Sequence, residues 1–157
     1  MEFRTATMDK ATKAITVVVG LVALANLIAA IQFQNQAFWV ISLILIAILL
    51  ISYLFIPKIY FEQRNLFISN TFRTVKIPVE SIQSVSELER GKLYTRTFGI
   101  GGLFGNFGYF NGKEFWLVTN SNKKVKIVTD TKTYVVSPEE TKKFIGHIHH
   151  LQNSINL

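Results

Sequence analysis

The sequence contains no cysteine, and it has few charged residues for its length. The absence of cysteine excludes disulfide bonds, zinc–thiolate sites, lipoprotein attachment and catalysis by a thiol. Charged residues make up 17% of the 157 residues, against roughly 25% in an ordinary soluble protein. Hydrophobic residues make up 49%, so disorder, collagen and coiled coil are also excluded. The length fits about one domain.

The shortage of charge is concentrated in residues 14–56, which contain no Asp, Glu, Lys, Arg or His. Two apolar runs, 14–31 and 37–56, are separated by the polar but uncharged residues 32–36. As helices these runs would be about 27 and 30 Å long, and the hydrocarbon core of a bilayer is ~30 Å thick. We therefore predict a transmembrane helical hairpin over residues 14–56, preceded by a short tail at 1–13.

Two other interpretations of the apolar stretch are weaker. A helical hairpin buried in a soluble protein would need other elements to cover it, and the 101 residues after Ile56 are too few to do this and also to form their own core. A cleaved signal peptide would use Ala23-Leu24-Ala25, which has the A-x-A form, but the apolar run continues past it to Ile31.

Basic residues flank both ends of the predicted hairpin, and none lies in its turn. Arg4, Lys10 and Lys13 precede the first run, and Lys58 and Arg64 follow the second. The positive-inside rule then places both termini in the cytoplasm.

Asn26 is the only strongly polar residue inside the first run. An amide in hydrocarbon seeks a hydrogen-bond partner, so we expect Asn26 to bond to the second helix or to another copy of the chain. Because neither run contains an ionisable residue, the hairpin makes a poor permeation path, and a transport role is not expected.

After Pro57 the pattern changes to short, nearly alternating runs rich in β-branched residues, which indicate about seven strands. These runs are 59–61, 66–68, 74–78, 81–88, 114–119, 124–129 and 133–136. The last segment differs, because Ser137 and Pro138 fit a helix N-cap and first helical position, and Phe144 and Ile148 then recur at helical spacing. We predict an α+β fold in which about seven antiparallel strands form a β-barrel or sandwich closed by a C-terminal amphipathic helix, the layout of the pleckstrin-homology (PH) superfold.

Residues 97–112 carry no charge and contain six glycines and five aromatic residues. A nucleotide-binding loop is excluded, because Phe104 stands where the G-x-G-x-x-G pattern needs its third glycine and Gly112-Lys113 is followed by Glu114. Two interpretations remain: the aromatic side chains fill the core of the domain, with glycines permitting tight turns, or they enter the bilayer interface.

This segment resembles a known family. Residues 96–110 (RTFGIGGLFGNFGYF) are similar to the R-x-F-G-x-G-G-L-F-G-Y-F-G-x-F signature of bacterial PH-domain membrane proteins, with Asn106 where the family usually has Tyr. The resemblance covers roughly residues 14–152. It implies a PH-like domain at 57–157, anchored by the two-span hairpin on the cytoplasmic side of a bacterial inner membrane, and it supplies no catalytic residue, metal or cofactor.

The residues themselves show no catalytic arrangement. His147 and His150 share one face of the last helix, but no third ligand is near in the sequence, and no nucleophile–base or acid–base pair is apparent. We therefore expect no enzyme activity, no cofactor and no small-molecule substrate. Nucleic acid is not expected either: the pI of about 9.7 invites it, but a membrane tether and the lack of a basic helix argue against it.

Basic and aromatic residues around the glycine segment are the candidate surface for a partner or for lipid. An anionic leaflet attracts such cations by ~1 kcal/mol each, and Lys123, Lys124, Lys126 and Lys132 on a later hairpin are further candidates. The candidate surface consists of Arg90, Lys92, Arg96, Phe98, Phe104, Phe107, Tyr109, Phe110 and Lys113.

The sequence favours a non-catalytic module that docks a protein partner, or its own copies, at the cytoplasmic membrane surface. The first alternative is a module that binds anionic lipid headgroups through the basic rim of the glycine segment. The second is a membrane enzyme, which the sequence does not favour.

Overall fold

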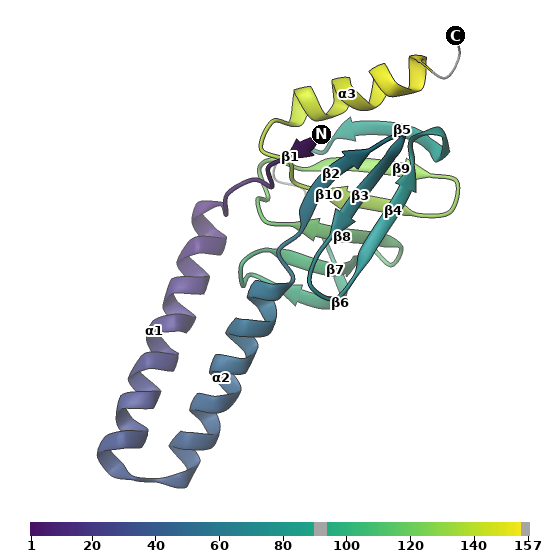
Figure 1. Cartoon of the computed structure of the whole chain (residues 1–157). Helices are drawn as coiled ribbons and strands as arrows, with labels where there is room; N and C mark the ends of the chain where they lie inside the picture. Colours follow the sequence, from purple (N-terminus) through teal and green to yellow (C-terminus); the bar gives the residue numbers. More distant parts are fainter. Residues whose placement is uncertain (90–93, 155–157) are drawn as a thin grey trace.

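The computed structural model describes residues 1–89 and 94–154 (Figure 1). Two long helices lie side by side as a hairpin that projects from one end of a β domain, and a third helix lies across the opposite end. The β domain consists of two sheets that do not close into a barrel. The predicted fold class is confirmed: a helical hairpin, a PH-like β sandwich and a C-terminal helix.

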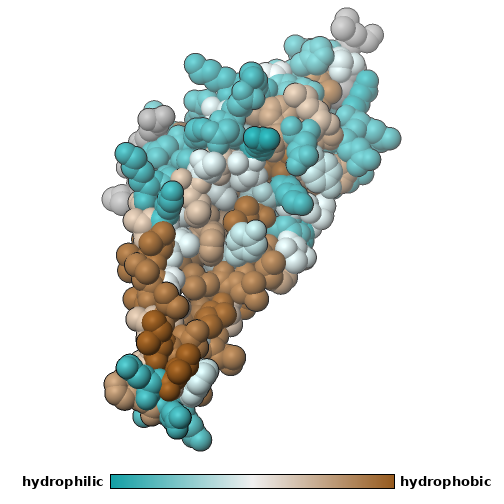
Figure 2. Space-filling model, turned by 60° about the vertical axis from the view of Figure 1, so that its left-hand side comes forward, coloured by the Kyte–Doolittle hydropathy of each residue, from teal (hydrophilic) through white to brown (hydrophobic). Residues whose placement is uncertain are grey.

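The hairpin consists of α1 (Lys10–Phe33) and α2 (Gln36–Leu54). The Asp9 carboxylate and the Asn35 amide oxygen each accept a hydrogen bond from a backbone N–H in the first turn of the helix that follows, so both helices begin at a side-chain cap. Both are long and apolar enough to cross a membrane. Their large apolar side chains are mostly exposed, and Figure 2 shows the resulting hydrophobic surface, with a hydrophilic tip at the turn. Exposed apolar surface of this extent marks contact with lipid or protein.

One polar contact joins the two helices within the apolar stretch. The Ser42 hydroxyl on α2 donates a 3.0 Å hydrogen bond to the Asn26 amide oxygen on α1. The Asn26 side chain therefore has a partner on the neighbouring helix, and an unsatisfied acceptor at this depth would be costly.

The first sheet has the order β1-β2-β3-β4 and is antiparallel throughout. Every second side chain of β2 and β3 is buried, which matches the alternation in the sequence. Its strands are β1 (Glu2–Phe3), β2 (Lys58–Glu62), β3 (Asn65–Ser69) and β4 (Thr74–Pro78).

A 3-10 turn, η1 (Val79–Ser81), leads into the second sheet, whose order is β5-β9-β10-β8-β7-β6. The β10 and β8 strands are parallel and the other pairs are antiparallel, because β10 inserts between its hairpin partner β9 and the earlier strand β8. The strands are β5 (Ile82–Glu87), β6 (Arg96–Gly101), β7 (Asn106–Phe110), β8 (Glu114–Val118), β9 (Val125–Thr129) and β10 (Thr133–Val136).

Over the described residues there are ten strands, where the pattern indicated about seven. The additional strands are β1, at the N-terminus, and β6 and β7, which form from the glycine segment. Pattern reasoning missed them because β1 has two residues, too short for a periodicity, and because glycines interrupt the alternation of apolar and polar residues in the other two.

The core lies between the facing sheets and beneath α3 (Thr141–Asn153). Ile59, Leu66 and Ile77 project into it from the first sheet, Ile127 from the second, and Phe144 from α3, and all are buried. The apolar stripe predicted for the last helix therefore packs against the strands, as its helical spacing indicated.

The helix start predicted at Ser137 is wrong, because α3 begins at Thr141 and has Glu140 at its N-cap position. The Ser137 side chain is instead fully buried and accepts a 2.8 Å hydrogen bond from the backbone N–H of Thr119. A helix cap and a buried hydrogen-bond partner use the same hydroxyl group, and the sequence does not distinguish them.

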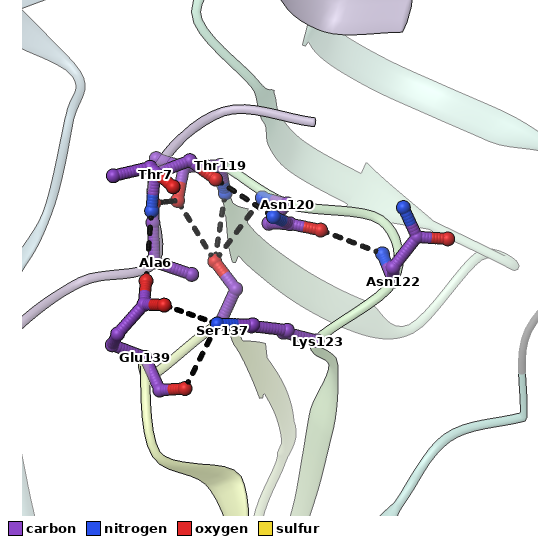
Figure 3. Close-up of polar contacts among 8 residues, drawn as sticks. All are labelled: Ala6, Thr7, Thr119, Asn120, Asn122, Lys123, Ser137 and Glu139. Carbon is purple, nitrogen blue, oxygen red and sulfur yellow. Dashed lines mark hydrogen bonds and ion pairs between the residues drawn. The ribbon is translucent and has the colours of Figure 1, made fainter. Parts of the chain in front are cut away.

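Residues 1–9, which the sequence assigned to a tail, lie on the β domain, and we call them the N-terminal strap. Phe3 pairs with Ile59 in the first sheet, and its ring packs 5.3 Å from that of Phe144. Figure 3 shows the polar contacts that hold the next residues: the Thr119 hydroxyl donates to the Ala6 carbonyl at 2.5 Å, and Asn120 Nδ2 donates to the carbonyl of the neighbouring strap residue Thr7 at 2.7 Å. The strap and the residues after α2 therefore meet in one domain, with the helical hairpin inserted between them.

Candidate binding groove

An apolar groove of about 600 Å³ opens between the two sheets, at the end of the domain that adjoins α2. We call it the aromatic groove. Its walls come from the residue after α2, the β3–β4 turn and strands β6 to β8. Its principal lining residues are Phe55, Phe72, Arg73, Phe98, Phe107, Tyr109 and Phe115.

Two phenylalanines at the groove are largely exposed. Phe98, on the edge strand β6, is 76% exposed, and Phe72, in the β3–β4 turn, is 56% exposed. Burying a phenylalanine is worth about 1.5–3 kcal/mol in water, so the fold forgoes much of that gain at both positions. Exposed aromatic side chains beside a groove indicate a surface that another molecule covers.

The β3–β4 turn is fixed to the end of the helical hairpin. The Asn70 side chain accepts hydrogen bonds from the N–H groups of Phe72 and Arg73, at 3.0 and 2.8 Å, which shapes the turn. The Thr71 N–H donates to the carbonyl of Leu54, the last residue of α2, at 3.3 Å. The aromatic groove is therefore positioned where α2 ends.

Phe55 connects the exposed turn to the core. The centroid of its ring lies 4.9 Å from the centroid of the Phe72 ring and 6.2 Å from that of the stacked Phe107 ring. The Phe107 side chain is 1% exposed. The floor of the groove is thus rigidly packed and its rim is exposed, which is the form of a pre-formed apolar binding site.

Arg73 brings a positive charge to the groove. Its guanidinium lies over the Phe115 ring, 5.5 Å from the centroid, and among the described residues no carboxylate pairs with it. Burial raises the pKa of the nearby Tyr134 hydroxyl, and the positive charge of Arg73 acts against that rise. An aromatic wall with an unneutralised guanidinium is suited to a ligand that is both apolar and anionic.

The glycine segment forms a β hairpin rather than a loop. Gly99 and Gly108 face each other across β6 and β7, both with φ of 129°. A Cβ atom on Gly99 would meet the Phe107 carbonyl oxygen at 2.1 Å, so a larger residue cannot occupy this close approach.

The turn of this β hairpin docks on the helices α1 and α2. The Phe104 N–H donates to the Thr16 hydroxyl on α1 at 3.0 Å, and the Phe104 ring lies 5.6 Å from that of Tyr53 on α2. Of the two interpretations left open for the segment, each describes part of it: Phe107 and Phe110 are buried in the domain, whereas Phe104 lies against the helices.

The structure brings together only some of the predicted surface residues. Phe98, Phe107 and Tyr109 line the aromatic groove, although Phe107 is its buried floor and offers little surface. Phe110 stacks 4.5 Å from Trp116 in a separate apolar cluster and is not part of any surface.

The predicted basic residues are scattered. Arg96 begins β6 and Lys113 follows β7, both exposed at the opposite end of that hairpin from Phe104, while Arg90 and Lys92 lie outside the described residues. On the β9 hairpin, Lys123 pairs with Glu139, and Lys126 pairs with Glu114 at 2.7 Å. Lys124 is buried, with its ammonium 4.1 Å from the centroid of the Tyr94 ring. These lysines are engaged within the domain and do not form a free basic surface.

Among the principal groove residues, the predicted surface did not include Phe55, Phe72, Arg73 or Phe115. The available signal was Phe72 itself, an aromatic residue beside Asn70 in a polar turn between two strands. The turn is separated in the chain from the glycine segment, and only the packing of the two sheets brings them together.

The titratable groups near the strap have structural roles. Within the residues that the structure describes, no group of three or more His, Cys, Asp or Glu side chains could hold a metal ion. His147 packs against the rings of Phe3 and Phe61, and burial lowers the pKa of its imidazole. The buried Ser137 hydroxyl contacts Thr119 rather than a base, so it lacks the activation that a nucleophile needs.

The fold and the groove together define a binding domain carried by a hairpin of two candidate membrane-spanning helices. Residues 58–152 match the family model described as Bacterial PH domain, and the chain belongs to that family. PH domains are generally non-catalytic binding modules. No curated protein and no solved structure matches the chain.

Proposed function

We propose that this protein is a non-catalytic binding module that the helical hairpin, residues 14–56, anchors in a bacterial inner membrane. Its PH-like domain, residues 57–157 together with the N-terminal strap, lies on the cytoplasmic side. The basic residues at both ends of the hairpin support this orientation. Because the strap pairs with β2, both ends of the hairpin must lie on the same side.

The aromatic groove is the binding site in this proposal. The observation that carries it is the position of the groove: it is open, apolar and rimmed by two exposed phenylalanines at the level where α2 ends. In Figure 2 the hydrophobic surface of the helices continues onto the adjoining edge of the domain. A site in this position takes its ligand from the membrane boundary, either a segment of a membrane-bound partner or a lipid.

Photo-crosslinking in native membranes tests the site without assuming its occupant. The photoreactive residue p-benzoylphenylalanine replaces Phe98 in the full chain, and a control variant carries it at Lys142, which is exposed on α3 at the far end of the domain. We expect a discrete adduct from position 98 that position 142 does not give. Equal labelling at both positions, or none at position 98, would overturn the proposal that the groove is a binding site.

A further inference from the structure

The chemistry of the aromatic groove narrows its occupant. We propose that the groove seats one anionic phospholipid from the adjacent leaflet, with the lipid phosphate at Arg73 and part of an acyl chain against Phe72, Phe98 and Phe107. This inference rests on the groove being the binding site of the proposed function.

The rim of the aromatic groove is apolar and exposed. Phe98 and Phe72 are both exposed at the aromatic groove, whose floor is formed by Phe107. In water such a rim is unfavourable, whereas aromatic rings are favoured at the level of the lipid headgroups. A cavity of about 600 Å³ lies within the range of ligand-binding pockets, ~300–1,000 Å³.

Arg73 supplies a positive charge at the wall of the groove. The guanidinium stacks on Phe115 at the groove wall and lacks a carboxylate partner among the described residues. A guanidinium is the donor group best matched to phosphate oxygens, since its planar fork gives two parallel hydrogen bonds. Among the described residues, the Arg73 guanidinium donates no hydrogen bond within the domain, so its N–H donors are available for such bonds.

A lipid can enter the groove from the adjacent leaflet. The turn that carries Phe72 and Arg73 is hydrogen-bonded to the last residue of α2, so the mouth of the groove lies at the membrane boundary. A phospholipid reaches this mouth by lateral movement within the leaflet, with its phosphate at the height of the turn and its chains below it. No feature of the groove matches the charge pattern of a polypeptide segment, and a polypeptide occupant is the alternative outcome of the test.

The test uses the purified full chain with p-benzoylphenylalanine at position 98, reconstituted in nanodiscs of equal amounts of phosphatidylcholine and phosphatidylglycerol. Adduct masses identify the crosslinked molecule. We expect phosphatidylglycerol adducts to exceed phosphatidylcholine adducts about fivefold, a factor that corresponds to ~1 kcal/mol. Both lipids carry the phosphate, but phosphatidylcholine also carries a trimethylammonium group, whose positive charge the Arg73 guanidinium repels.

Matched charge variants separate the groove from general attraction. Arg73→Gln should bring the two lipid adducts to equal amounts without reducing their sum, whereas Lys142→Gln, an equal loss of charge far from the groove, should leave the preference unchanged. Both side chains are exposed, and an unchanged melting temperature checks that each variant is folded. The preference of the parent protein tests the proposal even without the variants.

Three other outcomes would overturn the lipid proposal or both proposals. Lipid adducts in equal amounts from the parent protein would overturn the selection of anionic lipid. A polypeptide adduct in native membranes without any lipid adduct in nanodiscs would overturn the lipid occupant and leave the proposed function standing. No adduct above the level at position 142 in either membrane would overturn both.

Discussion

The Phe104 N–H donates a 3.0 Å hydrogen bond to the Thr16 hydroxyl, although 88 residues separate them in the chain. Thr16 is on the second turn of α1, and Phe104 is the tip of the β6–β7 hairpin. Together with the contact between Phe104 and Tyr53 on α2, this bond joins the β domain directly to both apolar helices. These contacts hold the β6–β7 hairpin, which supplies one wall of the aromatic groove, against the helices.

The N-terminal strap is expected to stabilise the domain through Phe3. Its side chain is 6% exposed and packs against Phe61 and Phe144. Phe3→Ala should lower the free energy of unfolding of the full chain by about 3 kcal/mol, because it leaves a cavity among the rings of Phe61, Phe144 and His147. Thermal unfolding in mild detergent measures this, with the exposed neighbour Glu2→Ala as a control. Equal stability of both variants would show that the strap does not contribute to the core.

Acid is expected to release the strap from the domain. Burial raises the pKa of the Asp9 carboxyl, but hydrogen bonds from the N–H groups of Thr12 and Ser121 outweigh that effect, and the folded-state pKa lies below the ordinary value of 3.8. The side-chain hydrogen bond from Lys123 and the N–H of Thr7 lower the pKa of Glu139. A depressed carboxyl pKa stabilises the folded state above the unfolded pKa, and this stabilisation is lost as the pH falls through the folded pKa.

Amide hydrogen exchange measures this release. Protection should be constant near neutral pH. It should fall at Ser121 below pH 3.8, the ordinary value for Asp9, and at Thr7 below pH 4.5, the ordinary value for Glu139. The variant Asp9→Asn should be less protected at neutral pH and should show a weaker dependence on acid. A variant with the same acid dependence as the parent protein would rule out the Asp9 carboxylate as the group responsible.

The glycine pair of the β6–β7 hairpin should tolerate no side chain. A Cβ atom on Gly108 would meet the Phe98 carbonyl oxygen at 2.3 Å, and the φ of 129° is strained for any other residue. We expect Gly108→Ala to destabilise the chain by more than about 2 kcal/mol. Gly146→Ala, in the exposed face of α3 with nothing within 4 Å, should instead stabilise it by about 1 kcal/mol. Chemical denaturation of both variants compares them, and a neutral Gly108→Ala would contradict the packed hairpin.

The orientation of the hairpin can be tested with single cysteines, since the sequence contains none of its own. A membrane-impermeant maleimide should label Asn35→Cys, at the turn between α1 and α2, in intact spheroplasts. It should label Lys142→Cys, on α3, only after the membrane is broken. The reverse pattern would place the domain outside, against the positive-inside rule.

The apolar runs and the alternating runs could be assigned from the sequence because each depends on residues that are close in the chain. Residues 14–31 lie within α1, and residues 37–56 overlap α2. Phe144 and Ile148 mark the buried face of α3. The glycine segment was harder. Its aromatic residues look alike in the sequence, but Phe98 is exposed because β6 is the edge strand, whereas Phe107 on β7 is buried against Phe55.

The two long apolar helices, most of the strands, the C-terminal helix and the family could be predicted from the sequence, because hydrophobic periodicity and a specific motif are local properties of the chain. Three features depend on packing and could not be predicted from the sequence: residues 1–9 complete the domain, Ser137 is a buried partner of Thr119, and Phe72 and Arg73 share a groove with Phe98. Each of these contacts joins residues far apart in the chain, and their proximity comes from how the two sheets and the helices pack.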